Sequence, residues 1–136
     1  MNKVIIAVIL AGFGAQLLKI IILWFKHKRL SLHDIVVTGG MPSSHAAFVI
    51  GLATILYFTE GTSSAFAVSL VLAFIVIRDS FGVRRSVGNE GKVIQKLLKL
   101  HKIDSKFHYA LGHTPIQVLA GSIMGFIISL LVHIYL

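Results

Sequence analysis

The sequence predicts an all-α integral membrane protein, a bundle of about four transmembrane helices with a short amphipathic helix at the membrane interface. Hydrophobic residues make up 56% of the 136 residues and charged residues 13%, which is more apolar surface than a soluble domain of this size can bury. Four apolar stretches approach or reach the roughly 17 to 25 residues that a helix needs to cross a bilayer. They are residues 4–25, 45–59, 63–78 and 114–136. We expect the whole chain, 1–136, to form a single membrane domain.

The first apolar stretch is predicted to stay in the protein as a transmembrane helix. Lys3 precedes it, as in a secretory signal peptide, but the stretch is about twice as long as the usual apolar region of such a peptide. The basic segment "KHKR" at residues 26–29 stands where a cleavage site with small residues would be expected. Within this helix, Lys19 is near enough to the end of the span to snorkel to the surface, and intramembrane polar groups usually face a partner or a cavity.

The distribution of basic residues predicts how the chain crosses the membrane. Spans two and three are separated by the short polar segment "TEGT" at residues 59–62 and should form an antiparallel hairpin. The two longer connections, about residues 26–44 and 79–113, must then emerge on one side. These connections and their border hold 11 of the 13 Lys and Arg residues. The positive-inside rule therefore predicts a multi-pass protein of the cell membrane with cytoplasmic connections and both termini outside.

The segment "KVIQKLLKLHKI" at residues 92–103 predicts an amphipathic helix. Its lysines fall on one side and its apolar residues on the other, which is typical of a helix that lies in the interface plane. The alternative is a solvated basic face that only holds a loop down. The net charge of +8 comes from residues that flank membrane spans, so anionic membrane lipids are the predicted partners and nucleic acid is not.

The composition also limits the chemistry. The chain has no cysteine, which excludes disulfides, thiolate chemistry and a cysteine-based zinc site. Asp79 and Glu90 are the nearest carboxylates to the polar motifs, and two acids without an organised set of oxygens are a weak metal site. We expect no metal and no cofactor.

Three polar clusters lie against the ends of predicted spans on the same side of the membrane. They are "GGMPSSHAA" at residues 39–47, "RDSFGVRRSVGNEG" at 78–91 and "GHTPIQVLAG" at 112–121. Their shared side predicts that they converge on one site.

The first cluster predicts an anion site at the start of a helix. Pro42 suits the opening turn, because its missing N–H would have no partner there. The backbone N–H groups of Ser43, Ser44 and His45 would then be free, and Gly40 would let the chain approach a ligand closely. Such a site suits phosphate. The alternative is a well-capped transmembrane helix with a serine-rich entrance.

The third cluster repeats the pattern, with Thr114 as a predicted N-cap, Pro115 as the first helical residue and His113 just outside the helix. A lone histidine at such a place is more often an interfacial hydrogen-bonding residue than a catalyst. Two histidines at two such helix starts, His45 and His113, favour a joint function.

The middle cluster supplies charge. Arg84 and Arg85 carry guanidinium groups that match phosphate oxygens two at a time. Asp79 is predicted to pair with these arginines or to orient a histidine. In the last span, Gly121 and Gly125 form a G-x-x-x-G pattern that permits close helix contact, either within the protomer or in a homodimer.

With these motifs, the sequence resembles the PAP2 superfamily, the type 2 phosphatidic acid phosphatases related to vanadium-dependent haloperoxidases. It is most similar to the divergent PAP2 family over essentially the whole chain. "MPSSHAA" resembles the Pro-Ser-Gly-His motif of the superfamily, with Ser44 where glycine is usual. "GHTPIQVLAG" resembles the segment that carries the nucleophilic histidine, and "DSFGVRR" is typical of the divergent branch.

The resemblance implies roles for individual residues. His113 would take the phosphoryl group and His45 would protonate the leaving oxygen. Ser43, Ser44 and nearby N–H groups would bind the phosphate, and the chemistry of the family needs no metal. Thr114, Gly40 and the two arginines complete the expected binding set.

Three departures from the superfamily pattern bear on these roles. The Lys-x6-Arg-Pro motif is absent, and Phe107 stands where an arginine six residues before His113 would be, so Arg84 and Arg85 are the proposed replacements. Gln117 occupies the position of the carboxylate that usually orients the nucleophile. Gln117 can still offer a carbonyl to an imidazole N–H, and Asp79 is the candidate for supplying the missing charge.

The resemblance therefore implies a membrane phosphatase that hydrolyses a lipid phosphomonoester or pyrophosphate at the cytoplasmic leaflet. A phospholipid precursor or a polyprenyl pyrophosphate would suit the geometry. The alternatives are a lipid-phosphate binding or transport protein with a degenerate site, and an assembly subunit without such a site.

Overall fold

The computed structural model describes residues 2–27, 40–103 and 112–136. These residues form helices and no β-strand: α1 (Lys3–His27), α3 (Ser44–Glu60), α4 (Ser64–Phe81), α5 (Val83–Leu100) and α6 (Pro115–Tyr135). By length and composition, α1, the α4–α5 segment and α6 could each cross a membrane, and α3 is a shorter apolar helix. The predicted all-α membrane bundle is confirmed. The remainder of the two predicted connections, and Phe107 with it, lies outside the described residues.

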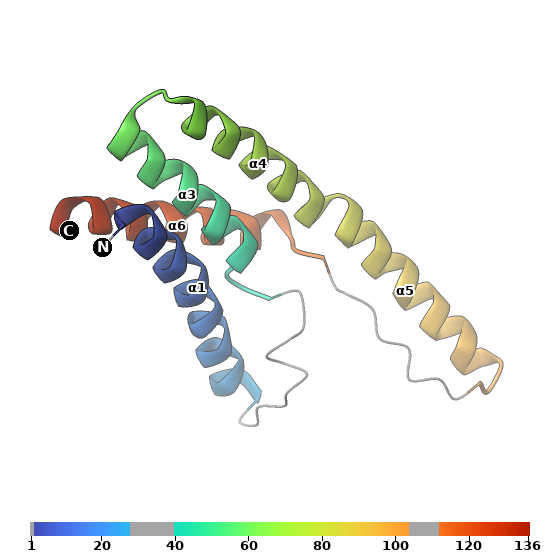
Figure 1. Cartoon of the computed structure of the whole chain (residues 1–136). Helices are drawn as coiled ribbons and strands as arrows, with labels where there is room; N and C mark the ends of the chain where they lie inside the picture. Colours follow the sequence, from blue (N-terminus) through green and yellow to red (C-terminus); the bar gives the residue numbers. More distant parts are fainter. Residues whose placement is uncertain (1, 28–39, 104–111) are drawn as a thin grey trace.

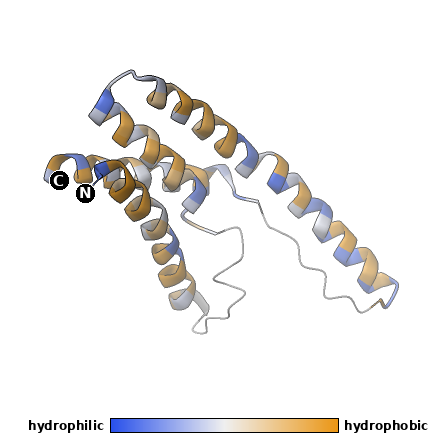
Figure 2. Ribbon diagram, viewed as in Figure 1, coloured by the Kyte–Doolittle hydropathy of each residue, from blue (hydrophilic) through white to orange (hydrophobic). Residues whose placement is uncertain are grey.

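Helix α3 is the centre of the bundle, and it packs against α1, α4 and α6 (Figure 1). Its buried residues are mostly small, as are those of α1, where Ala7, Ala11 and Ala15 have no exposed surface. Small residues let helix backbones approach closely, which is how membrane helices gain contact without a hydrophobic driving force. At Gly12 a Cβ atom would lie 2.1 Å from the ring of Phe48. Many of the larger apolar side chains are exposed instead, and Figure 2 shows that hydrophobic residues dominate the bundle helices.

The glycines of α6 contact α3 within the chain. A Cβ atom on Gly121 would lie 2.1 Å from the carbonyl oxygen of Ser43, and one on Gly125 would lie 2.4 Å from that of Ala47. One turn farther, the Ser129 hydroxyl donates a hydrogen bond of 2.9 Å to the carbonyl of Gly51. The G-x-x-x-G pattern thus joins α6 to α3 inside one protomer, and this face of α6 is covered.

The predicted hairpin of spans two and three is observed. Helix α3 ends at Glu60, and Gly61 adopts a φ of 67° that favours glycine. The Ser63 hydroxyl then caps α4 by accepting a hydrogen bond from the N–H of Phe66 at 3.2 Å. The chain termini lie at the same end of the bundle as this turn, and the starts of α3 and α6 lie away from it (Figure 1).

The middle cluster differs from the sequence expectation, because most of it is helical. Helix α5 begins at Val83 and ends at Leu100, whereas the amphipathic pattern placed a helix at 92–103. Gly82 interrupts the helix: its N–H still bonds to the carbonyl of Arg78 at 2.9 Å, and its own carbonyl accepts from Ser86 N at 3.1 Å. The helix therefore restarts directly and continues roughly in the direction of α4 (Figure 1).

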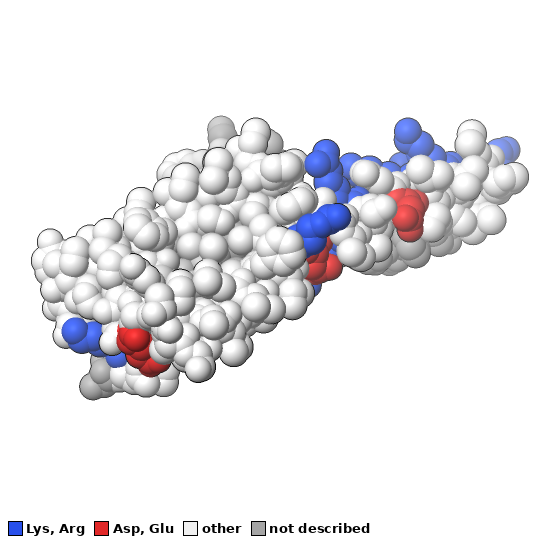
Figure 3. All heavy atoms as spheres, turned by 90° about the horizontal axis from the view of Figure 1, so that it is seen from above, with Lys and Arg blue, Asp and Glu red and all other residues white. Residues whose placement is uncertain are grey.

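Helix α5 has the predicted amphipathic character. Its lysines and its apolar side chains Val93, Ile94, Leu97 and Leu100 are exposed. Figure 3 shows Lys and Arg gathered over this projecting half of the molecule, while the bundle half has few charges on the face in view. A position in the membrane interface remains a prediction for this helix.

Candidate functional site: two histidines at paired helix starts

Two backbone hydrogen bonds bring the three polar clusters together. The N–H of Ser43, just before α3, donates to the carbonyl of Gln117 in α6 at 3.0 Å. The N–H of His113 donates to the carbonyl of Ser80 near the end of α4, also at 3.0 Å. The starts of α3 and α6 and the end of α4 are therefore fixed against one another. This arrangement creates a polar site at one end of an otherwise apolar bundle.

The start of α3 differs in detail from the prediction. Ser43, not Pro42, defines the helix start: Ser43 is the N-cap, and its hydroxyl accepts a hydrogen bond from Ala46 N at 3.4 Å. A serine side chain suits this position because it satisfies an N–H that the helix cannot. Pro42 lies one residue earlier, outside the helix. Since Ser43 is fully buried, its hydroxyl holds the helix start and is not exposed to a ligand.

Fewer backbone N–H groups can therefore bind an anion than the sequence suggested. The N–H of Ser43 is occupied by Gln117, whereas the N–H groups of Ser44 and His45 have no hydrogen-bond partner among the described residues. These two groups lie in the first turn of α3, where the helix dipole also favours a negative charge. The Ser44 side chain is partly exposed beside them.

His45 and His113 face each other across the two helix starts. Their ring centroids are 6.1 Å apart and their planes meet at 70°. His113 is only 2% exposed, and His45 is half-buried. The Nδ1 atom of each ring is buried without a hydrogen-bond partner in the described part of the chain. Neither ring is therefore held in place by a hydrogen bond from its Nδ1 atom to a described residue.

Helix α1 adds a charge to the site through Lys19. Lys19 is 4% exposed, so the snorkelling considered from the sequence does not occur. Its aliphatic stem lies beside Gly40, where a Cβ atom would be 3.4 Å from Lys19 Cδ. The φ of 90° at Gly40 explains why glycine is needed at this contact. Lys19 could be recognised in the sequence because it is a charged residue inside an apolar span, toward the end of the span from which the polar clusters emerge.

Of the two candidate arginines, Arg84 is the one that belongs to the site. Its Nε atom donates to Asp79 Oδ2 at 2.5 Å, and its positive charge acts on both histidines. Arg85 is exposed, and its backbone forms a surface against which Gly112 packs, since a Cβ atom there would lie 2.3 Å from Arg85 N. Asp79 therefore pairs with an arginine, one of the two roles expected for it, and makes no hydrogen bond to either imidazole.

The start of α6 matches the prediction for its cap but not for Gln117. Thr114 is the N-cap and Pro115 the first helical residue. The Gln117 side-chain carbonyl accepts from Thr114 N at 2.9 Å, and the Thr114 hydroxyl accepts from Gln117 N at 3.4 Å. This capping box uses the Gln117 side-chain carbonyl, which could otherwise accept a hydrogen bond from an imidazole N–H. Among the described residues, no group of three or more His, Asp or Glu side chains lies close enough to hold a metal ion.

The surroundings keep His113 neutral. Burial is the largest cause and lowers the pKa of His113 to about 4 from its usual 6.5, because a charged imidazolium is poorly solvated there. The nearby positive charges of His45, Lys19 and Arg84 act in the same direction. A neutral imidazole retains the lone pair that a nucleophile needs, and this state should persist well below neutral pH.

Imidazole NMR can test this charge state without any assay of activity. At about pH 5.5, where an ordinary histidine is mostly protonated, the nitrogen signals of His113 should remain those of a neutral ring. Protonation should become visible only as the pH falls toward 4. A His113→Gln variant identifies the signal by its loss. Titration of that signal near 6.5 would contradict the buried, positively charged surroundings.

The fold and the site define the class of protein: a multi-pass helical membrane protein with two histidines at paired helix starts. A family model described as the divergent PAP2 family matches residues 1–128. The chain is also similar to the uncharacterized membrane protein YuiD of Bacillus subtilis (strain 168), at 35% identity, in a match that covers 85% of this chain and 84% of that protein. No solved structure matches the chain. The chain belongs to the divergent PAP2 family, which confirms the resemblance inferred from its motifs.

Proposed function

We propose that this protein is a membrane phosphatase that hydrolyses a lipid phosphomonoester or pyrophosphate through a phosphohistidine at His113. The observation that supports this most strongly is the pairing of His113 with His45 at 6.1 Å between ring centroids, at two helix starts with Lys19 and Arg84 beside them. Membership of a PAP2-related family supports a phosphatase-related role.

The proposed phosphate position lies at the first turn of α3. Phosphate oxygens would accept from the N–H groups of Ser44 and His45, with the ammonium of Lys19 supplying opposite charge. Asp79 holds Arg84 through Nε, which leaves the terminal guanidinium nitrogens to donate to two phosphate oxygens. Bound phosphate would in turn favour a protonated His45, because an opposite charge stabilises the imidazolium.

The chemistry follows from the two imidazoles. Nε2 of neutral His113 attacks phosphorus, the bond from phosphorus to the leaving oxygen breaks, and protonated His45 gives that oxygen its proton. Water then attacks the phosphohistidine, and neutral His45 takes a proton from that water as the phosphorus–nitrogen bond breaks. Inorganic phosphate leaves, and both histidines return to their starting states.

A second candidate is a protein that binds or transports a lipid phosphate without hydrolysing it. Two observations favour it: the Gln117 carbonyl belongs to the α6 cap, and Asp79 pairs with Arg84. Among the described residues, His113 thus has no carboxylate partner to stabilise the charge it would gain, and the loss of such a carboxylate in a serine protease reduces turnover by about 10⁴. Hydrolysis by this chain is accordingly expected to be slow.

A phosphate-release screen separates the two candidates. Purified protein in lipid vesicles is incubated with phosphatidate, phosphatidylglycerophosphate and a polyprenyl pyrophosphate, and free phosphate and lipid binding are both measured. Release above the level of the His113→Ala variant supports the phosphatase. Tight binding of a lipid phosphate with release equal to that variant supports the binding protein and contradicts the phosphatase.

Lys19 should contribute to phosphate binding. Replacing it with methionine keeps the length of the side chain but removes a charged donor, and hydrogen bonds to charged groups contribute about 1.5–3 kcal/mol. We expect affinity for a fluorescent lipid phosphate to fall by about ten- to hundredfold in detergent solution. Lys99→Met, which removes an exposed charge of α5, is the matched control. Equal affinity in the Lys19 and Lys99 variants would remove Lys19 from the site.

We further propose that the site faces the cytoplasm, and the lack of cysteine in the chain makes this simple to test. Single cysteines are placed at Thr62, in the α3–α4 turn, and at Lys99, on α5. A membrane-impermeant maleimide should label the Thr62 variant in intact cells and the Lys99 variant only after permeabilisation. The opposite pattern would place the site on the outer face.

A further inference from the structure

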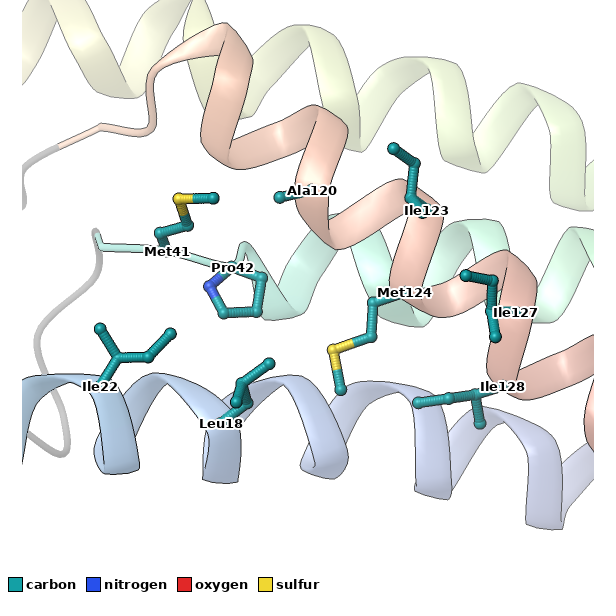
Figure 4. Close-up of a pocket in the computed structure, with 9 residues that line it drawn as sticks. All are labelled: Leu18, Ile22, Met41, Pro42, Ala120, Ile123, Met124, Ile127 and Ile128. Atoms are coloured by element: carbon teal, nitrogen blue, oxygen red, sulfur yellow. The ribbon is translucent and has the colours of Figure 1, made fainter.

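An apolar groove of about 320 Å³ runs along the seam between α1 and α6. Figure 4 shows its walls: Leu18 and Ile22 come from α1, and Ala120 and Met124 belong to one face of α6. Met41 and Pro42, which lead into α3, lie at one end of it. The volume falls at the lower end of the roughly 300–1,000 Å³ that is usual for ligand pockets. The described residues that line it include no charged side chain.

The groove adjoins the polar site at three points. Leu18 precedes Lys19 in α1, Pro42 precedes the Ser43 cap of α3, and Ala120 precedes Gly121, which contacts Ser43. Each wall of the groove thus passes directly into a residue that supports the phosphate position. The apolar hollow between α3 and α4 differs, because its lining residues, such as Tyr57 and Phe58, lie toward the other end of α3.

Helices α1 and α6 approach each other near the other end of the groove. At Gly14 the two helices meet, and a Cβ atom there would lie 3.5 Å from both Met124 Cε and Ile128 Cδ1. The α6 wall from Ala120 to Ile128 rises by about 12 Å. The space is therefore a short apolar slot between the two helices, and it begins next to the residues that support the phosphate position.

We propose that this groove holds the first part of one hydrocarbon chain of the lipid whose phosphate binds at Ser44 and His45. The inference rests on the proposed phosphate site. A lipid phosphate joins a charged head to an apolar chain, and the protein places a positively charged site next to an apolar slot in the same order. The size of the slot suits one chain and not two side by side.

The groove orients the bound lipid and adds little hydrophobic affinity. Bilayer lipid is as apolar as the groove lining, so a chain gains little free energy by moving from one to the other. A seated chain instead fixes the direction from which the headgroup reaches the first turn of α3. Small displacements of a reacting group have large kinetic effects, so residues such as Ala120 and Leu18 are positioning residues for the reaction.

Photo-crosslinking tests the groove without relying on hydrolysis. The probe is a long-chain alkyl phosphate with a diazirine near the middle of its chain, added to protein in phosphatidylcholine vesicles. Labelled residues are located by mass spectrometry. Labels should concentrate on Leu18, Met41 and Met124 and not on the outer face of α4. The same probe with a hydroxyl in place of the phosphate should show no such preference.

Two variants fill the groove from opposite walls: Ala120→Phe and Leu18→Trp. Either should lower labelling of the groove by about tenfold, the effect of a side chain that overpacks an occupied space. Ala67→Phe, the same change at an exposed alanine of α4, should leave labelling unchanged. The second groove variant keeps the test decisive if the first fails to fold.

The outcomes separate this inference from the proposed function. Groove labelling together with no phosphate release from any substrate would support the groove and contradict the phosphatase. Phosphate release with labels spread equally over α4 and the groove would support the phosphatase and overturn the groove. Labelling that neither groove variant reduces would also overturn it.

Discussion

Replacing His113 by alanine is expected to lower phosphate release by about 10⁴-fold or more in the same vesicles. The reason is that His113 supplies the only proposed bond to phosphorus, and a removed nucleophile cannot be compensated by binding alone. Binding of the lipid phosphate should persist, because Lys19, Arg84 and the first turn of α3 remain. The measurement is phosphate release at saturating substrate, with affinity determined separately.

His133 provides the matched control. It lies near the other end of α6, and like His113 it has a buried Nδ1 without a partner among the described residues. Its ring stacks on Phe58 at 5.1 Å, far along the helix from the site. His133→Ala should therefore retain turnover. Equal turnover in wild type and both histidine variants would eliminate His113 as the nucleophile.

Replacing Gly121 by alanine is expected to have the largest effect on the fold. The added methyl would lie 2.1 Å from the Ser43 carbonyl oxygen and 3.0 Å from its carbon, and backbone atoms cannot turn aside as a flexible side chain can. Helices α3 and α6 would have to separate, which would break the 3.0 Å bond from Ser43 N to Gln117 O. We expect at least about 1–3 kcal/mol of destabilisation, with loss of the phosphate position.

Thermal unfolding in detergent measures this effect, and Gly14→Ala is the control. Gly14 also lies at a helix contact, but an added Cβ there would meet its neighbours at 3.5 Å, an ordinary van der Waals distance. The Gly14 variant should melt near the wild-type temperature and the Gly121 variant clearly below it. Equal melting temperatures would show that the close α3–α6 contact does not hold the site together.

The sequence predicted the parts of this protein that depend on local pattern. Apolar length located the helices, and the Gly61 turn and the Thr114 cap follow from residues that act within a few positions of themselves. The convergence of the three clusters was also predictable, because the topology predicted from the sequence places their connections on one side. In each case a pattern along the sequence determines the structural feature directly.

The remaining features depend on contacts between distant segments. Lys19 carries a charge within an apolar span, and only the packing of α1 beside Gly40 distinguishes a buried site residue from a snorkelling one. The Gln117 carbonyl had two competing partners, and the local N–H of Thr114 was bound in preference to the imidazole. Helix α5 begins early because the backbone leaves helical geometry only at Gly82, whose hydrogen bonds to Arg78 and Ser86 are kept. The presence of a glycine in a polar segment does not reveal this.

Trapping of a phosphohistidine tests the proposed mechanism most directly. Protein in vesicles is mixed with a lipid phosphate labelled with ³²P, quenched with alkali and digested. A phosphohistidine is stable to alkali and labile to acid, and the label should be found on the peptide that contains His113, in wild type and in His133→Ala but not in His113→Ala. Phosphate release with no alkali-stable label on that peptide, or a label that persists in His113→Ala, would contradict the mechanism.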